Sequence, residues 1–209
     1  MANQRQQKQK LLEILRLLQR ETDAEHPIKC SEIIARLSQN KISAERKSVY
    51  SDLEILRQAG WDIRYRKNEG YWLNPRYSLA QLKLLSDAVS SLTMLSAVQA
   101  EQLNGALMAE CPRFQQPQLT PILPADHTSG ADILANIDQI LRALRESVEI
   151  EFRYFDITVH KQKRYRRQSQ TYQLFPYALI RENQRYYCVG YSFHHQGFSH
   201  YRLDKMEQI

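Results

Sequence analysis

The order of hydrophobic and polar residues divides the chain into a mainly helical part and a β-rich C-terminal part. Between residues 8 and 147, apolar residues mostly recur every three or four positions, which is typical of helices with one buried face. From Val148 onward, apolar and polar residues alternate, which predicts strands. Residues 61–73 interrupt the helical part with a shorter alternation, and we expect a hairpin there.

The first 75 residues predict three helices followed by that hairpin. The helices are expected at residues 8–20, at residues 30–40 with Cys30 or Ser31 first, and from Ser43 or Ala44 to a stop at Gly60. The wide apolar face of the first helix holds Leu11, Leu12, Ile14, Leu15 and Leu18. The hairpin runs from Trp61 to Leu73 and turns at residues 67–70, where Asn68 and Gly70 tolerate positive φ.

Basic residues gather at the start of the third helix and on the hairpin. A winged helix-turn-helix presents these two places to DNA, because its helix enters the major groove and its wing lies against phosphates. The candidate DNA-binding residues are Arg46, Lys47, Ser48, Tyr50, Ser51, Arg64, Arg66 and Lys67. Asp52 is expected to fix a neighbouring cation or backbone group. The alternative is a helical bundle whose cations form a solvated face.

Residues 76–147 predict a helical linker between an N-terminal domain, 1–75, and a C-terminal domain, 148–209. Ser78 caps the first linker helix, and a capping box at Ser96 opens a second that runs to about Glu110. A proline-rich loop at residues 111–130 precedes a third helix at residues 132–146. The apolar faces of these helices fit either a spacer packed on itself or a dimer contact.

Residues 148–209 predict a small, strongly bent antiparallel sheet or barrel. One face of its first strand holds Val148, Ile150, Phe152 and Tyr154. A basic segment, residues 161–167, follows. Three more strands are expected at residues 172–180, 185–191 and 198–203, with turns at residues 182–184 and 195–197.

Aromatic and cationic residues interleave in this C-terminal part, a combination that suits stacking on bases and pairing with phosphates. The candidate effector-binding residues are Tyr154, Arg164, Arg166, Tyr187, Tyr191 and Arg202. For each of these tyrosines the alternative is a core position with a polar tip. For Arg202 the alternative is an ion pair with Asp204 or another carboxylate.

Composition narrows the function classes. The chain has a formal net charge of +6, with the excess of cations at its two ends, so two separate anion-facing surfaces are expected. Its three cysteines lack CxxC spacing, and no ligands complete a metal site around His194, His195 and His200. We find no cofactor motif, nucleophile elbow, signal core or membrane-spanning run. A cytoplasmic protein that is not an enzyme and holds no metal or cofactor is therefore expected.

The order and spacing of these blocks resemble bacterial regulators that join a DeoR-like winged helix-turn-helix to a WYL domain. In the N-terminal part the resemblance rests on residues 46–53, 60–63 and 70–73. In the C-terminal part it rests on residues 152–154, 176–179, 186–191 and 201–206. The Trp-Tyr-Leu motif that names the WYL domain is replaced by Tyr186-Tyr187-Cys188 in this chain.

The resemblance implies an α+β protein whose C-terminal domain is a small SH3/Sm-like antiparallel β-barrel. That domain would sense an anionic effector, a nucleic acid or nucleotide, and change how the winged helix binds double-stranded DNA. Relatives commonly continue into a further dimerisation-linked domain, so the chain is either a piece of a longer protein or naturally short. We expect a homodimeric transcriptional regulator; the alternative is a non-enzymatic module that binds protein or RNA.

Overall fold

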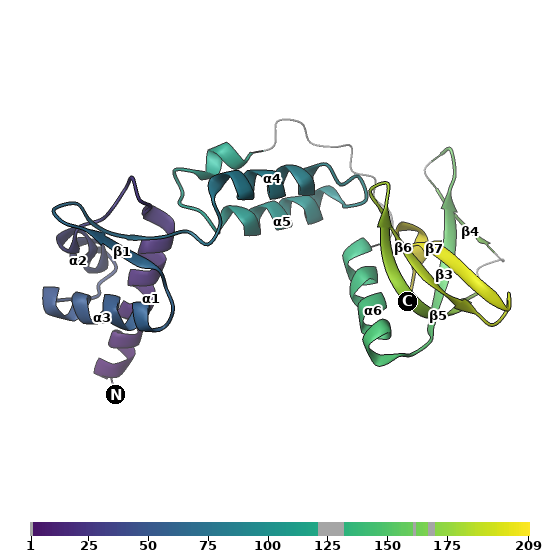
Figure 1. Ribbon diagram of the computed structural model, residues 1–209, viewed down its shortest axis with the longest axis horizontal. Helices are drawn as coiled ribbons and strands as arrows, with labels where there is room; N and C mark the ends of the chain where they lie inside the picture. The colour runs from purple at the N-terminus through teal and green to yellow at the C-terminus, as the bar shows by residue number, and fades with distance from the viewer. Residues whose placement is uncertain (1, 121–131, 161, 167–169) are drawn as a thin grey trace. The chain divides into compact units, whose positions relative to one another are not determined.

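The computed structural model describes residues 2–120, 132–160, 162–166 and 170–209, and this part of the chain mixes helix and strand (Figure 1). Its elements are six α-helices, a two-stranded hairpin and a curled six-stranded antiparallel sheet. They form two compact units, Met1–Val89 with Gln102–Ile122 and Ser90–Glu101 with Leu123–Ile209. The α+β prediction is confirmed at this level. The domain boundaries predicted after residues 75 and 147 stay predictions.

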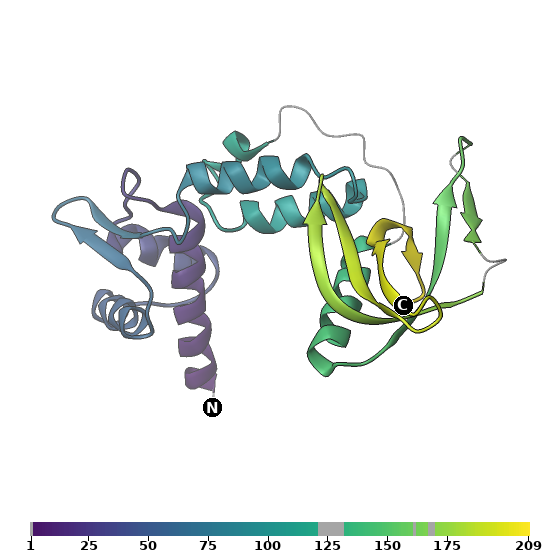
Figure 2. The same cartoon turned by 45° about the vertical axis from the view of Figure 1, so that its right-hand side comes forward.

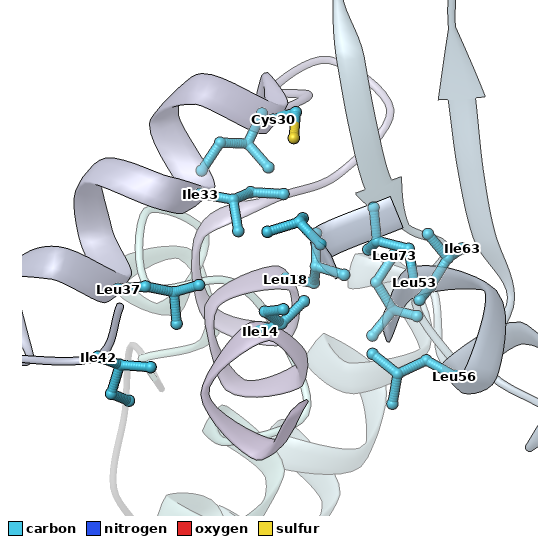
Figure 3. Packing of buried hydrophobic residues seen from close by; sticks show 12 residues of the cluster. Ile14, Leu18, Cys30, Ile33, Leu37, Ile42, Leu53, Leu56, Ile63 and Leu73 are labelled. Carbon is cyan, nitrogen blue, oxygen red and sulfur yellow. The ribbon is translucent and has the colours of Figure 1, made fainter. Parts of the chain in front are cut away.

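The first unit begins with three helices and a hairpin around one apolar core. The elements are α1 (Ala2–Glu21), α2 (Cys30–Gln39), α3 (Arg46–Gln58), β1 (Ile63–Arg66) and β2 (Gly70–Leu73). Figure 3 shows how α1 supplies Ile14 and Leu18 to the centre of this core, where side chains of α2, α3 and the hairpin surround them. Each of the three helices therefore buries an apolar stripe against this core.

Two details of the N-terminal prediction are wrong. The third helix begins at Arg46, not at Ser43 or Ala44, because Ile42 is buried and the residues after it stay extended up to the N-cap Glu45. Leu12 is 55% exposed and does not belong to the buried face of α1. The core side of the helix instead follows the four-residue spacing of Lys10, Ile14 and Leu18.

A short backbone contact fastens the hairpin to the segment before α2. The amide of Ile28 donates to the carbonyl of Tyr71 and the amide of Tyr71 donates back to Ile28, both at 2.8 Å. Gly70 makes this approach possible, since a Cβ there would lie 2.2 Å from the Ile28 carbonyl oxygen and its φ is +127°. Asn68 also has positive φ, as the predicted turn requires.

The first unit also contains α4 (Leu79–Ser90), the short helix η1 (Gln116–Leu119) and the part of α5 (Ala97–Met108) that begins at Gln102. The start of α5, up to Glu101, belongs to the second unit. Both predicted caps are present: Ser78 and Gln81, and likewise Ser96 and Gln99, exchange side chain–backbone hydrogen bonds of 2.8 to 3.2 Å. The predicted loop at residues 111–130 contains η1, and its last ten residues lie outside the described residues.

The second unit contains α6 (Ile133–Glu146) and the curled sheet (Figure 2). Its strands are β3 (Ile150–Ile157), β4 (Lys163–Tyr165), β5 (Tyr172–Glu182), β6 (Arg185–Ser192), β7 (Gly197–Arg202) and β8 (Met206–Glu207). The order is β4-β3-β5-β6-β7, and β8 also pairs with β3. The three predicted later strands and their turns are confirmed within two residues. The closed SH3/Sm-like barrel stays a prediction.

The first strand of this sheet differs from its prediction at one end. β3 begins at Ile150, and Val148 is 45% exposed, because α6 ends only at Glu146 and Ser147 takes a left-handed conformation as its C-cap. The other predicted core positions, Ile150, Phe152 and Tyr154, are buried. The strands β4 and β8, of three and two residues, were too short for their alternation to predict them.

Helix α6 is joined to the end of the sheet by a buried amide. Asn136 Nδ2 donates to the carbonyl oxygens of Leu203 at 2.9 Å and Met206 at 2.8 Å. Around it, Phe152 packs edge-on against Tyr201 and stacks on Tyr172, with ring centroids 5.0 and 5.5 Å apart. The amide binds carbonyls at both ends of the turn formed by residues 203–206, so it fixes where the chain turns toward β8.

We predict that Gly70→Ala destabilises the first unit by at least about 2 kcal/mol, because alanine disfavours this φ and its methyl group meets a backbone carbonyl. The free energy of unfolding can be measured in urea by tryptophan fluorescence, since Trp61 lies just before β1 and Trp72 lies within β2. Gly105→Ala in α5 is the control, because an added Cβ meets nothing within 4 Å there. Equal stability of the two variants would contradict the prediction.

Candidate nucleic-acid and effector surfaces

The first turns of α3 present most of the predicted DNA-binding side chains to solvent. Arg46, Lys47, Tyr50 and Ser51 are exposed, and neither cation has an ion-pair partner among the described residues. Glu45 precedes them as an N-cap without a side-chain hydrogen bond, and the first turn holds no carboxylate. This end of the helix therefore combines free cations with unneutralised backbone N–H groups, which favours an anionic partner.

Ser48 is the exception on this helix. It is half-buried, and its hydroxyl accepts a hydrogen bond from Lys10 Nζ of α1. The same amine lies 2.9 Å from Asp52 Oδ2, so the expectation that Asp52 fixes a neighbouring cation is met by the geometry. The Ser48 hydroxyl oxygen thus accepts a hydrogen bond from α1, and the hydroxyl can still donate its own hydrogen to another acceptor.

The hairpin cations are exposed, but two of the three are paired. Arg64 lies 2.6 Å from Asp62, and Arg66 lies 2.6 Å from Glu69 and also 5.1 Å from the centre of the Trp72 ring. Lys67, at the turn, makes no ion pair within the described ranges. Exposed pairs of this kind contribute at most about 1 kcal/mol each, so phosphates can replace their carboxylates at small cost.

The prediction missed an aromatic cluster between α3 and the hairpin. The rings of Tyr50 and Tyr71 are 6.3 Å apart, and those of Tyr65 and Tyr71 are 4.8 Å apart. Tyr65 is 54% exposed, whereas burial raises the pKa of Tyr71. Arg57 Nε donates to the Ile63 carbonyl at 2.9 Å, which ties the end of α3 to β1 beside this cluster.

Four of the predicted effector-binding residues meet at one edge of the curled sheet. The guanidinium of Arg166 lies 5.4 Å from the centre of the Tyr154 ring, and the Tyr154 hydroxyl accepts from the backbone N–H of Arg202 at 3.3 Å. Tyr187 is the cross-strand partner of Arg202. Tyr154 itself is buried and covered by Arg166, as its alternative interpretation expected, so it supports this edge and does not offer a free ring.

Two carboxylates hold the cations of this edge. Asp156 accepts from Arg166 Nε at 2.7 Å and from Lys205 Nζ at 2.8 Å. Asp204 accepts from Arg202 at 2.7 Å and from Arg185 at 2.8 Å, so the alternative for Arg202 is the geometry observed. We call the four cations the cationic rim: Arg166, Arg185, Arg202 and Lys205. Because four cations share two carboxylates, the rim keeps two excess positive charges.

The sequence did not single out two members of the rim. Arg185 and Lys205 looked like ordinary turn and end-of-strand cations, and only the fold of residues 202–206 brings them to Asp204 and Asp156. The hydrogen bonds from Arg166 and then Lys205 hold the pKa of Asp156 well below its usual range. In turn, the hydrogen bond to Asp204 raises the pKa of the Arg202 guanidinium.

The remaining predicted effector residues lie apart from the rim. Arg164 is exposed on β4 and has no ion pair in the described part of the chain. Tyr191 is on the outer face of β6, where its ring lies 5.2 Å from Phe193 and 5.9 Å from Phe198. A groove of about 360 Å³ beside this face is lined by Ile180, Glu182, Tyr187, Val189, Phe198, Ser199 and His200.

The described residues give little support for a metal site, a reactive cysteine or a membrane-spanning helix. No group of three metal-ligating side chains occurs among residues 2–120, 132–160, 162–166 and 170–209. Cys30, Cys111 and Cys188 are buried thiols, and burial raises the pKa of Cys188 to about 12, which keeps it protonated at neutral pH. None of the described helices is both long enough and apolar enough to cross a bilayer.

A comparison of the sequence with known protein families finds a match in the second unit. Residues 135–209 are a WYL domain. The match begins within α6 and covers the curled sheet and the whole cationic rim. At the motif that names the domain, Tyr187 is half-buried beside Arg202 and Cys188 is fully buried, so the WYL domain of this chain keeps an aromatic and a small apolar residue at those places.

Other comparisons give less. No curated protein sequence matches the chain. Among solved structures, the chain is similar to proteasome accessory factor B/C (PafBC) of Arthrobacter aurescens, with 17% sequence identity and a TM-score of 0.30. The similarity covers 96% of this chain and 32% of that chain. The present chain thus spans about a third of the length of PafBC.

We predict that Asp156→Asn lowers the stability of the WYL domain by about 1 kcal/mol at pH 7, because three charge-assisted hydrogen bonds, two from Arg166 and one from Lys205, weaken. The pKa of Asp156 is depressed in the folded state, so the carboxylate stabilises the fold fully above its ordinary pKa of 3.8. That contribution is lost as the pH falls through the depressed folded-state pKa.

The difference between the two proteins should therefore shrink as the pH falls below about 4. It can be measured as the free energy of unfolding in urea at pH 7, 5, 4 and 3. Asp138→Asn is the matched control, since this exposed carboxylate of α6 has no ion pair in the ranges that the structure describes. A difference that grows between pH 5 and pH 3 would show that the ionised carboxylate does not stabilise the domain.

Proposed function

We propose that this chain is a transcriptional regulator that binds double-stranded DNA through its first unit and an anionic effector through its WYL domain. The elements α1, α2 and α3 with the hairpin β1–β2 act as a winged helix-turn-helix. The effector is a nucleotide or a nucleic acid, and its binding changes the affinity for DNA. The proposal contains no catalytic step and needs no metal or cofactor.

The DNA-binding half of the proposal is supported by the distribution of unpaired charge. Arg46 and Lys47 stand exposed at the N-terminal end of α3, and Lys67 stands exposed at the hairpin turn. These are the two places that enter the major groove and follow the phosphate backbone in a winged helix. A generic bundle gives no reason for free cations to gather there while cations such as Arg16 and Arg142 are paired with carboxylates on their own helices.

The effector half is supported by the cationic rim within the WYL match. Its two excess positive charges attract an anion, and its guanidinium groups can pair with phosphate oxygens in bidentate fashion. Tyr187 lies across from Arg202 and offers a half-buried ring to a base. An incoming phosphate would compete with Asp156 and Asp204 for their partners, so the effector must carry enough charge to displace or share them.

The two halves are coupled only if the effector prefers one arrangement of the protein over another. We propose that the protein acts as a homodimer on a partly palindromic operator, because two-fold symmetry then places two α3 helices on successive turns of DNA. Effector binding would change how the two DNA-binding units are presented. The competing hypothesis is a module that binds a protein or a regulatory RNA and has no role at promoters.

We predict that Arg46→Ala weakens binding to the preferred DNA duplex about tenfold, because one base or phosphate contact of α3 is lost. The preferred duplex is first selected from a random library, and affinities are measured by fluorescence anisotropy over a series of salt concentrations. Lys67→Ala should weaken all duplexes alike and lower the salt slope by about 1, since it contacts phosphate only.

Arg142→Ala is the control for these variants, because Arg142 is an exposed cation of α6 in the second unit. It should leave both the affinity and the salt slope unchanged. If the unaltered protein binds no duplex, or binds duplexes without a salt dependence, the DNA-binding half of the proposal fails and the interaction module is favoured.

We predict that Arg202→Ala abolishes the response of DNA binding to the effector and changes basal DNA affinity by less than about twofold, because Arg202 belongs to the second unit and α3 to the first. The response is measured as the change in duplex affinity when short single-stranded oligonucleotides or nucleotides are added. Arg181→Ala is the control, since Arg181 is an exposed cation of β5 outside the rim. A normal response of Arg202→Ala would place the effector elsewhere.

A further inference from the structure

A lysine of α1 is buried where the apolar pattern of that helix calls for a hydrophobic residue. Lys10 follows the same four-residue spacing as Ile14 and Leu18, which are completely buried, and is itself only 7% exposed. Its amine reaches α3, where it donates to the hydroxyl of Ser48 and lies 2.9 Å from Asp52 Oδ2. Ser48 and Asp52 are four residues apart, so Lys10 spans one turn on the inner face of α3.

Lys10 is the one charged partner of the Asp52 carboxylate among the described residues. Asp52 is 9% exposed, and apart from the ion pair its Oδ2 has no hydrogen-bond donor among the described residues. Val49, Leu53 and Leu56 surround it on the same face of the helix, and all three are buried. A charged pair in such apolar surroundings loses its hydration. The mutual attraction of the two groups offsets that loss of free energy only when their geometry is good.

Stability does not explain why this pair is present. Replacing a buried ion pair with apolar side chains of similar volume is commonly neutral or stabilising, whereas removing one partner leaves a buried charge and is costly. What an ion pair supplies and an apolar contact does not is directional fixing of one element against another. Leucine and isoleucine side chains alone allow α3 to rotate or slide on α1 with little change in burial.

We propose that Lys10 is a positioning residue for DNA readout. By binding Ser48 and Asp52 it fixes the rotation and axial register of α3 on α1. The exposed residues Arg46, Lys47 and Ser51 are thereby oriented toward the major groove. This inference rests on the proposed DNA-binding function. Neighbouring residues of a helix point about 100° apart, so the exposed face that meets DNA is set directly by how the buried face is held. A contact to base edges requires placement to within about 1 Å, whereas attraction to phosphates does not.

The test is the paired variant Lys10→Met with Asp52→Leu, which removes both charges and keeps the volume apolar. Its unfolding midpoint in urea should equal or exceed that of the unaltered protein. Its specificity ratio, the affinity for the preferred duplex divided by that for a random duplex, should fall about tenfold, which is the loss of one base contact. The affinity for random duplex and its salt slope should stay unchanged, because Arg46, Lys47 and Lys67 are still present.

Two further variants make the result specific. Lys10→Met alone should be clearly less stable than the paired variant, since it leaves the Asp52 charge buried without its partner. The control, Glu13→Leu with Arg16→Met, removes an exposed ion pair of the same helix, in which the two groups lie 3.0 Å apart. It should keep the specificity ratio of the unaltered protein.

A paired variant that folds and keeps the full specificity ratio overturns the inference while leaving the proposed function in place. If the paired variant does not fold, Asp52→Asn decides, because it leaves Lys10 and its hydrogen bond to Ser48 and removes only the charge that fixes the lysine. An unchanged ratio in Asp52→Asn then overturns the inference, and a lowered ratio supports it. If the unaltered protein prefers no duplex, the proposed function and this inference fail together.

Discussion

The first unit depends on a close approach of two backbones at Gly70. The segment before α2 and the hairpin exchange two hydrogen bonds between Ile28 and Tyr71, and a side chain at residue 70 would separate them. This contact holds β2 next to the turn of the hairpin, and Arg57 of α3 donates to the carbonyl of Ile63 at the start of β1. Because the hairpin is held both near its turn and at its base, the turn with Lys67 projects at a defined place relative to α3.

The WYL domain is organised by comparable fixed points. The amide of Asn136 donates to the carbonyls of the first residue of η3 (Leu203–Lys205) and the first residue of β8. In addition, Tyr154 accepts a hydrogen bond from the backbone N–H of Arg202. The short segment that contains Arg202, Asp204 and Lys205 is therefore fixed at both of its ends. The cationic rim exists because this segment carries a carboxylate flanked by cations and lies next to Asp156 of β3.

The sequence predicted the elements of this fold better than their contacts. Period and caps located α2, the three helices of the predicted linker and three strands of the sheet, because burial of one face and satisfaction of helix ends are local constraints. The errors arose where the apolar pattern alone does not locate the core side or the end of an element. Leu12 is exposed because the core side of α1 follows Lys10, Ile14 and Leu18, and Val148 is exposed because the left-handed residue Ser147 ends α6. Likewise the DNA-facing cations were visible as local clusters, but Arg185 and Lys205 reach the rim only through the turn at residues 203–205.

The two candidate surfaces differ in how their cations are held, and this difference fits the roles that we propose. Arg46 and Lys47 of α3 have no ion pair in the part of the chain that the structure describes, and a buried ion pair holds the inner face of the helix, so a partner meets charges that need no exchange. In the rim each cation already has a carboxylate, so a partner must replace Asp156 or Asp204 in several bonds at once. Binding at the first surface is thus expected to follow the salt concentration, whereas binding at the second rearranges bonds within the domain, as a sensor requires.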